Sequence, residues 1–134
     1  MIAVDTSVAI AAFASWHESH PQAVRIVRER PALPAPCALE LYAVLTRLPP
    51  PHRARGAIVR DYLGQAFPGT PLTLPDDRHS RIVHELVAMG ITGGASYDAV
   101  IAMIAAHHGC QLVTLDLRAR ATYDRVGVAV QMLA

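Results

Sequence analysis

The sequence predicts an α/β fold in which a parallel β-sheet is covered by helices on both faces. Short apolar runs that suit buried strands alternate along the chain with segments of helical periodicity, which is the usual pattern of parallel sheets. The length of 134 residues fits one domain with one hydrophobic core. We therefore expect a single domain over residues 1–134.

The composition predicts a folded protein without a membrane segment. Hydrophobic residues make up 52% of the chain and charged residues 17%, which is unlike a disordered sequence. The apolar runs are shorter than the ~18 residues that a membrane helix needs. The N-terminus also lacks the basic region of a signal peptide. These features together favour a cytoplasmic location.

The first half of the chain contains one clear strand, four helical segments and one short extended segment. Ile2–Val4 is an apolar run that suits a buried strand. Pro36 suits the first turn of a helix, where the N–H that proline lacks is not needed. We expect helices at Ser7–Ala14, His20–Arg30, Pro36–Leu48 and His52–Phe67, and a brief strand at Ala32–Pro34.

The second half contains two helical segments and three strand candidates. Asp76 or Asp77 suits the cap of a helix that runs to Met89 and ends at Gly90. A second helix should begin with Ser96 as its N-cap and stop at Gly109. The expected strands are Leu72–Leu74, Leu112–Thr114 and Val126–Met132.

Two aspartates follow strands at positions where a ligand site is expected. Asp5 follows the first strand directly, and Asp116 lies just beyond the strand that ends at Thr114. Ligands of open parallel sheets bind beyond the carboxyl ends of the strands, where the strand order reverses. If these two strands flank that point, the two carboxylates converge there.

Two more acids stand near the starts of apolar helices, namely Glu40 and Asp98. Acids in apolar surroundings are partly desolvated, and they repel one another unless a cation neutralises them. Carboxylate ligands without Cys or His fit Mg²⁺ or Mn²⁺. Such a site can activate a water molecule and hold a phosphate during in-line displacement.

Each acid also has a purely structural explanation. The helix dipole favours an acid near a helix start, as for Glu40 and Asp98. Asp5 fits an N-cap, and Asp116 fits an ordinary turn. The occurrence of all four in this order favours a functional site.

Four motifs carry a resemblance to a known family. They are Met1-Ile2-Ala3-Val4-Asp5-Thr6-Ser7, Leu39-Glu40, Tyr97-Asp98-Ala99-Val100-Ile101-Ala102 and Leu112-Val113-Thr114-Leu115-Asp116. Their types and order resemble the PIN-domain family, especially the VapC-type toxins of bacterial toxin–antitoxin pairs. The resemblance spans the whole chain.

This resemblance implies a five-stranded parallel sheet of order 3-2-1-4-5 and a Mg²⁺-dependent RNA endonuclease, with Mn²⁺ able to replace Mg²⁺. The expected catalytic residues are Asp5, Glu40, Asp98 and Asp116, and the first, third and fourth are the expected metal ligands. The expected partners are an RNA substrate, a cognate antitoxin protein and a second copy in a homodimer.

Several further residues have both a functional and a structural interpretation. Thr6, Ser7 and Thr114 suit a role in orienting the carboxylates, and they equally suit capping and turns. Arg47 and Arg118 suit phosphate binding, and they equally suit a solvated surface.

One segment departs from the family pattern. No acid follows Asp116 before Asp124, which leaves the number of metal ions open. The chain has two cysteines, Cys37 and Cys110, and neither lies in a metal-ligand motif, so we expect two buried free thiols.

Two other functions fit parts of the pattern. A phosphatase of the haloacid-dehalogenase type also has an Asp after its first strand, but it needs a second Asp where this chain has Ser7. A PIN-like scaffold that binds a partner without catalysis would not need all four acids. The sequence therefore favours the nuclease.

Overall fold

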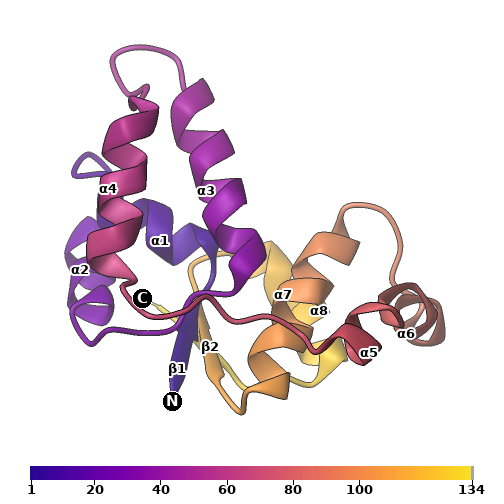
Figure 1. Ribbon diagram of the computed structural model, residues 1–134. Coiled ribbons are helices and arrows are strands. Elements are labelled where there is room, and N and C mark those ends of the chain that lie inside the picture. Colours follow the sequence, from indigo (N-terminus) through magenta and orange to yellow (C-terminus); the bar gives the residue numbers. More distant parts are fainter. Residues whose placement is uncertain (134) are drawn as a thin grey trace.

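A parallel sheet lies at the centre of the computed structural model, which describes residues 1–133 (Figure 1). Within these residues the sheet has three strands in the order β1 (Ile2–Val4), β2 (Gln111–Thr114) and β3 (Val130–Met132). Both pairings are parallel. The strand residues that follow the first position of β1 and β2 are all buried, as expected when helices cover both faces.

Two further segments extend the sheet on the far side of β1. Ala32 forms a single parallel bridge with Ala3, and Leu72 forms one with Pro34. The five segments therefore lie side by side in the predicted order 3-2-1-4-5. Within residues 1–133, the segments around Ala32 and Leu72 form isolated bridges and not the full strands that were expected. Prolines interrupt both segments, and proline lacks the N–H that a ladder requires.

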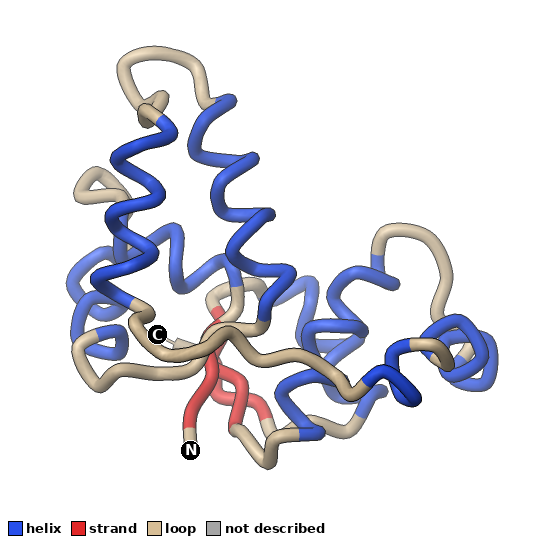
Figure 2. Tube along the Cα trace, viewed as in Figure 1, coloured by secondary structure: helices blue, strands red, loops and turns tan. Residues whose placement is uncertain are grey.

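The helices form two layers around the sheet (Figures 1 and 2). One layer holds α1 (Thr6–Phe13), α2 (His20–Val27), α3 (Ala35–Arg47) and α4 (Gly56–Ala66). The other holds α7 (Ala95–His107) and α8 (Leu117–Val126), with α5 (Asp76–His79) and α6 (Ile82–Met89) beside α7. Because the layers change between β1 and β2, the strand order reverses there, and Asp5 and Asp116 follow these two strands.

Several element boundaries differ from the sequence expectation; for example, α4 begins at Gly56 and not at His52, and α2 ends at Val27 and not at Arg30. The helix expected up to Met89 is divided into α5 and α6, with Pro75 and not an aspartate before α5. The Ser80 hydroxyl donates to the Asp77 carbonyl at the break, and such a bond competes with the helical pattern. Gly94, not Ser96, precedes α7.

The last difference concerns the C-terminal segment. Residues 117–126 form α8, so the final strand begins at Val130 and not at Val126. Gly127 ends α8 with a φ of 96°, a conformation that glycine adopts without strain. Gly90 ends α6 in the same left-handed region, as the sequence predicted.

The main core lies between the sheet and its two helical layers. Its largest fully buried side chains include Val4, Val8, Leu41, Leu112 and Tyr123. Both cysteines are buried and free, as expected. In the described part of the chain, no helix is long and apolar enough to cross a membrane.

Candidate active site

Asp5 lies at the carboxyl end of β1 and is only 3% exposed. It is the N-cap of α1, and its Oδ1 accepts hydrogen bonds from the backbone N of Ser7 at 3.0 Å and of Val8 at 3.4 Å. Its own backbone N donates to the Val113 carbonyl of β2. The N-cap interpretation of Asp5 is therefore confirmed. Only Oδ1 takes part in the cap, so capping does not use Oδ2.

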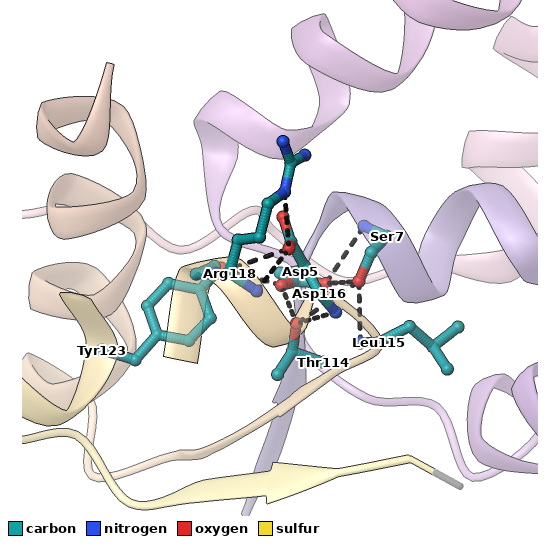
Figure 3. A network of polar contacts seen from close by, with 8 residues as sticks. Asp5, Ser7, Thr114, Leu115, Asp116, Arg118 and Tyr123 are labelled. Atoms are coloured by element: carbon teal, nitrogen blue, oxygen red, sulfur yellow. Dashed lines mark hydrogen bonds and ion pairs between the residues drawn. The ribbon is translucent and has the colours of Figure 1, made fainter. Parts of the chain in front are cut away.

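Ser7 and Thr114 hold the Asp5 carboxylate from two different elements (Figure 3). The Ser7 hydroxyl donates to Oδ1 of Asp5, and the Thr114 hydroxyl donates to Oδ2. Ser7 also accepts from the backbone N of Leu115, and Thr114 accepts from the backbone N of Asp116 at 3.0 Å. The two hydroxyls thus connect the ends of β1 and β2.

Asp116 begins α8 in the same way that Asp5 begins α1. Its Oδ1 accepts from the backbone N of Arg118 at 3.0 Å and of Ala119 at 3.4 Å. The Arg118 guanidinium lies 3.7 Å from the same oxygen. Because the Arg118 side chain is 95% exposed, solvent weakens this ion pair.

Asp98 shows most clearly that the acids form one group. Its pKa is raised from 3.8 to about 6, first by burial and then by the charges of Asp116, Glu40 and Asp5 in that order. Only the charge of Arg118 opposes them. The four predicted acids come from four different elements: the cap of α1, α3, α7 and the cap of α8. The charges of the other three nevertheless all act on Asp98.

Glu40 and Cys37 lie on α3, which faces the same group. Glu40 is exposed, and its charge acts on both Asp98 and Cys37. Burial, with smaller effects from Asp5 and Glu40, raises the pKa of the Cys37 thiol to about 12. Cys37 therefore stays protonated and is a poor nucleophile.

Two of the predicted supporting residues lie differently from the others. The Thr6 hydroxyl is buried beside the Cys37 thiol, and its oxygen has no hydrogen-bond partner within residues 1–133, so it does not orient a carboxylate. Arg47 is exposed at the last residue of α3. Because Glu40 lies about two helical turns earlier, roughly 10 Å separates the two residues along the helix axis.

Tyr123 is a residue of this site that the sequence analysis missed. Its side chain is 1% exposed, and its hydroxyl donates to Oδ2 of Asp5 at 2.8 Å, from the side opposite Ser7 (Figure 3). The sequence could have indicated Tyr123 only if the helix after Asp116 had been predicted. Once residues 117–126 are taken as a helix capped by Asp116, Tyr123 lies two turns later, on the same face as the cap.

The residues present fit a hard divalent cation in kind. Within residues 1–133, no three Asp, Glu, His or Cys side chains lie close enough together to hold a metal ion in this arrangement. Mg²⁺ often keeps several waters and uses only one or two protein carboxylates. The repulsion that raises the pKa of Asp98 is a feature that a hydrated cation would offset.

An open hollow of about 400 Å³ adjoins Asp116. Ser7, Leu115 and Asp116 line one part of it, and His17 to Ser19 of the α1–α2 loop line another. Substrate therefore has room to approach Asp116 from this side.

The comparisons with known proteins agree with this architecture. The sequence matches the PIN domain family over residues 2–125. It is 44% identical to Ribonuclease VapC40 of Mycobacterium tuberculosis over 133 residues, which cover 99% of each chain. It is 40% identical to Ribonuclease VapC27 of the same organism over 134 residues, which cover 99% of this chain and 97% of the relative.

The solved structures show the same fold. VapBC2 from Rickettsia felis, bound to a DNA fragment from its promoter, matches with a TM-score of 0.68 and 14% identity over 100% of both chains. The predicted motifs, the strand order and the full-length identity to two relatives thus agree, and the chain belongs to the PIN-domain family, within its VapC group.

Proposed function

We propose that this chain is a metal-dependent endoribonuclease, formed by one domain over residues 1–134, and the toxin of a toxin–antitoxin pair. The observation that carries the proposal is the raised pKa of Asp98, because burial and the charges of Asp116, Glu40 and Asp5 all act on it. Two relatives named ribonucleases are similar along nearly their full length, which supports the same activity.

We infer that Asp5, Asp98 and Asp116 together hold Mg²⁺, in part through water molecules that the ion keeps, and that Mn²⁺ can replace it. When bound, such a cation lowers the pKa of a water molecule and neutralises charge on a phosphate. The chain's own part is to fix the carboxylates. Five hydrogen bonds hold Asp5 in place, whereas Asp98 is subject to the repulsion of three neighbouring carboxylates.

Glu40 and Arg118 have complementary roles in this proposal. Glu40 is exposed and its charge reaches Asp98, so it can accept a proton from the attacking water. The Arg118 guanidinium, which in the free protein lies near Asp116, can turn toward a substrate phosphate. Arg47 stands further along α3 and would contact the RNA strand only away from the reacting phosphate.

Direct attack by water fits the side chains around the acids. The Ser7 hydroxyl both donates to Asp5 and accepts from Leu115 N, so it is fully engaged. Cys37 is held protonated, and Nδ1 of His17 accepts from Ser19 N. No covalent intermediate is therefore expected, and the products should carry 5′-phosphate and 3′-hydroxyl ends.

The test incubates RNA with the wild type and with Asp98→Asn, each with Mg²⁺ or with EDTA, and maps the product ends. Cleavage should require the metal and disappear in Asp98→Asn. Asp124→Asn is the matched control, because Asp124 is an exposed acid of α8 paired with Arg120. Cleavage that survives EDTA, or cyclic phosphate ends, would reject the mechanism.

The same experiment separates the alternatives. A phosphatase of the haloacid-dehalogenase type needs a second Asp where this chain has Ser7, and the Ser7 hydroxyl already donates to Asp5. A non-catalytic scaffold would bind its partner normally, and the wild type would cleave no RNA under any condition. Full activity of Asp98→Asn would reject the site and leave the family assignment untouched.

The proposed protein partner is an antitoxin that covers exposed apolar side chains on the α3–α4 pair. Leu39 is 73% exposed, Tyr42 is 44% exposed and Ile58 is 51% exposed. An amphipathic helix of the antitoxin can bury such side chains. Co-expression with the protein encoded next to this gene should give one complex on gel filtration, and the free chain should elute as a homodimer.

A further inference from the structure

An aromatic pair joins two loops outside the acidic group. Trp16, the single tryptophan of the chain, follows α1 and is 49% exposed. Its ring lies against that of His52 from the α3–α4 loop, with 4.4 Å between ring centroids and 35° between planes. We call this pair the Trp16–His52 platform. If the contact served only to hold the two loops together, we would expect the Trp16 side chain to be more fully buried.

His17, the neighbour of Trp16 in sequence, connects the platform to the hollow beside Asp116. His17, whose ring centroid lies 6.2 Å from that of Trp16, lines the hollow together with Glu18 and Ser19. The same hollow is lined by Ser7 and Asp116. A ligand that occupies the hollow at Asp116 can therefore continue toward Trp16 along the α1–α2 loop.

The charges around the platform select the type of ligand. Arg53 and Arg55 are exposed on the loop that carries His52, and Arg53 Nε donates to the Leu48 carbonyl at 2.8 Å. The hollow itself carries the carboxylates of Glu18 and Asp116, which repel phosphate. A suitable ligand thus has flat apolar faces for the platform and separate phosphates for the arginines, and an unpaired RNA strand has both.

We propose that the Trp16–His52 platform stacks an unpaired base of the RNA, on the part of the strand that leads away from the cleaved bond. This inference rests on the proposed ribonuclease function and adds a binding site to it. Stacking on an aromatic ring tolerates every base, because each base has a π-face. The platform would therefore select single-stranded over double-stranded RNA and would not read sequence.

The single tryptophan makes the test direct. A short oligouridylate is titrated into Asp98→Asn in EDTA, so that no cleavage occurs, while tryptophan fluorescence is recorded. The strand should quench the fluorescence. An abasic strand with the same number of phosphates should bind more weakly and leave the fluorescence unchanged, and so should the oligouridylate paired with its complement.

Variants separate stacking from a structural role of the loop. By anisotropy of a labelled strand, Trp16→Ala should bind about tenfold more weakly, since stacking contributes about 1–3 kcal/mol per base. Trp16→Phe keeps an aromatic face and should restore most of the affinity. His52→Ala should weaken binding, whereas His84→Ala, which changes an exposed histidine of α6, should not.

The outcomes distinguish this inference from the proposed function. Wild-type cleavage of RNA without quenching in the binding assay would overturn the platform and leave the ribonuclease standing. Quenching by the oligouridylate without wild-type cleavage would support the platform and count against the ribonuclease. Fluorescence that responds only to the antitoxin protein would show that the platform binds protein and would overturn the inference.

Discussion

The Tyr123 hydroxyl donates a 2.8 Å hydrogen bond to Asp5 although 118 positions separate the two residues in the chain. Both side chains are buried, at 1% and 3% exposure. Burial, followed by the charge of Asp5, raises the pKa of Tyr123 far above its usual range, so it remains a donor at any physiological pH. The bond ties α8 to the end of β1, and it holds the carboxylate that both caps α1 and faces the acidic group.

Tyr123→Phe removes this donor and keeps the ring. We expect a loss of about 1.5–3 kcal/mol in the free energy of unfolding, because hydrogen bonds to charged groups contribute that much. Urea unfolding of the metal-free protein measures it. Tyr62→Phe is the matched control, since the Tyr62 hydroxyl donates at 2.8 Å to the neutral carbonyl of Ala9. A larger loss in Tyr62→Phe than in Tyr123→Phe would contradict the prediction.

The stability of the metal-free protein should depend on pH through Asp98. Its pKa is about 6 in the folded state against an ordinary value of 3.8, so the folded protein binds more protons between these values. The stability contributed by Asp98 is present below about pH 4 and is lost as pH rises through about 6. In EDTA, Asp98→Asn should become about 1 kcal/mol more stable than the wild type at neutral pH, after allowance for partial exposure.

Thermal or urea unfolding from about pH 4 to about pH 7 measures this difference. Asp61→Asn, which changes an exposed acid of α4, should follow the wild type across the range. If the difference between Asp98→Asn and the wild type were constant with pH, the repulsion assigned to Asp98 would be absent.

Divalent cations should raise the melting temperature of the wild type. A ligand that binds only the folded state stabilises it by RT ln(1 + [L]/Kd), or about 2.7 kcal/mol at a hundredfold excess over Kd. The shift should shrink in Asp98→Asn and in Asp116→Asn and persist in Asp124→Asn. Titration calorimetry gives the same answer without RNA. If the wild type showed no heat of binding and no shift in melting temperature, metal binding would be rejected.

Thr114→Val should disturb the site more than Thr114→Ser. The Thr114 hydroxyl donates to Asp5 and accepts from Asp116 N, in a residue that is fully buried. Valine leaves the Asp116 N–H without this acceptor and removes one of the two donors to Oδ2 of Asp5, so we expect a loss of roughly 2–4 kcal/mol in the free energy of unfolding. Serine keeps the hydroxyl and should cost less, with RNA cleavage retained. Equal losses in the two variants would show that the methyl group contributes as much as the hydroxyl, which would contradict the prediction.

Local sequence was sufficient to predict the strands that precede Asp5 and Asp116, whereas the five-strand order came from the family resemblance. The apolar run of Ile2–Val4 and the run that ends at Thr114 are short and strongly biased, so their strands could be predicted without long-range contacts. Strand order then put Asp5 and Asp116 at the point where the helical layers change. The assignment of Glu40 and Asp98 relied on the family resemblance, because an acid near a helix start is common for other reasons.

Other features depended on contacts that no local pattern contains. The Ser80 side chain divides one expected helix into two, and the prolines reduce two expected strands to single bridges. Asp116 caps the helix of residues 117–126 by accepting two backbone hydrogen bonds. This helix brings Tyr123 to Asp5. The pairing of Trp16 with His52 likewise joins loops from two different parts of the chain.

The sequence by itself determined which residue types are present and at which strand and helix ends they stand. Backbone propensity and hydrophobic periodicity act over a few residues, so they are visible in the chain. Only the tertiary structure decided how the charges act on one another, because burial and distance set the pKa of Asp98. It also decided which hydroxyls serve the site: Ser7, Thr114 and Tyr123 donate to Asp5, whereas Thr6, its neighbour in sequence, points elsewhere.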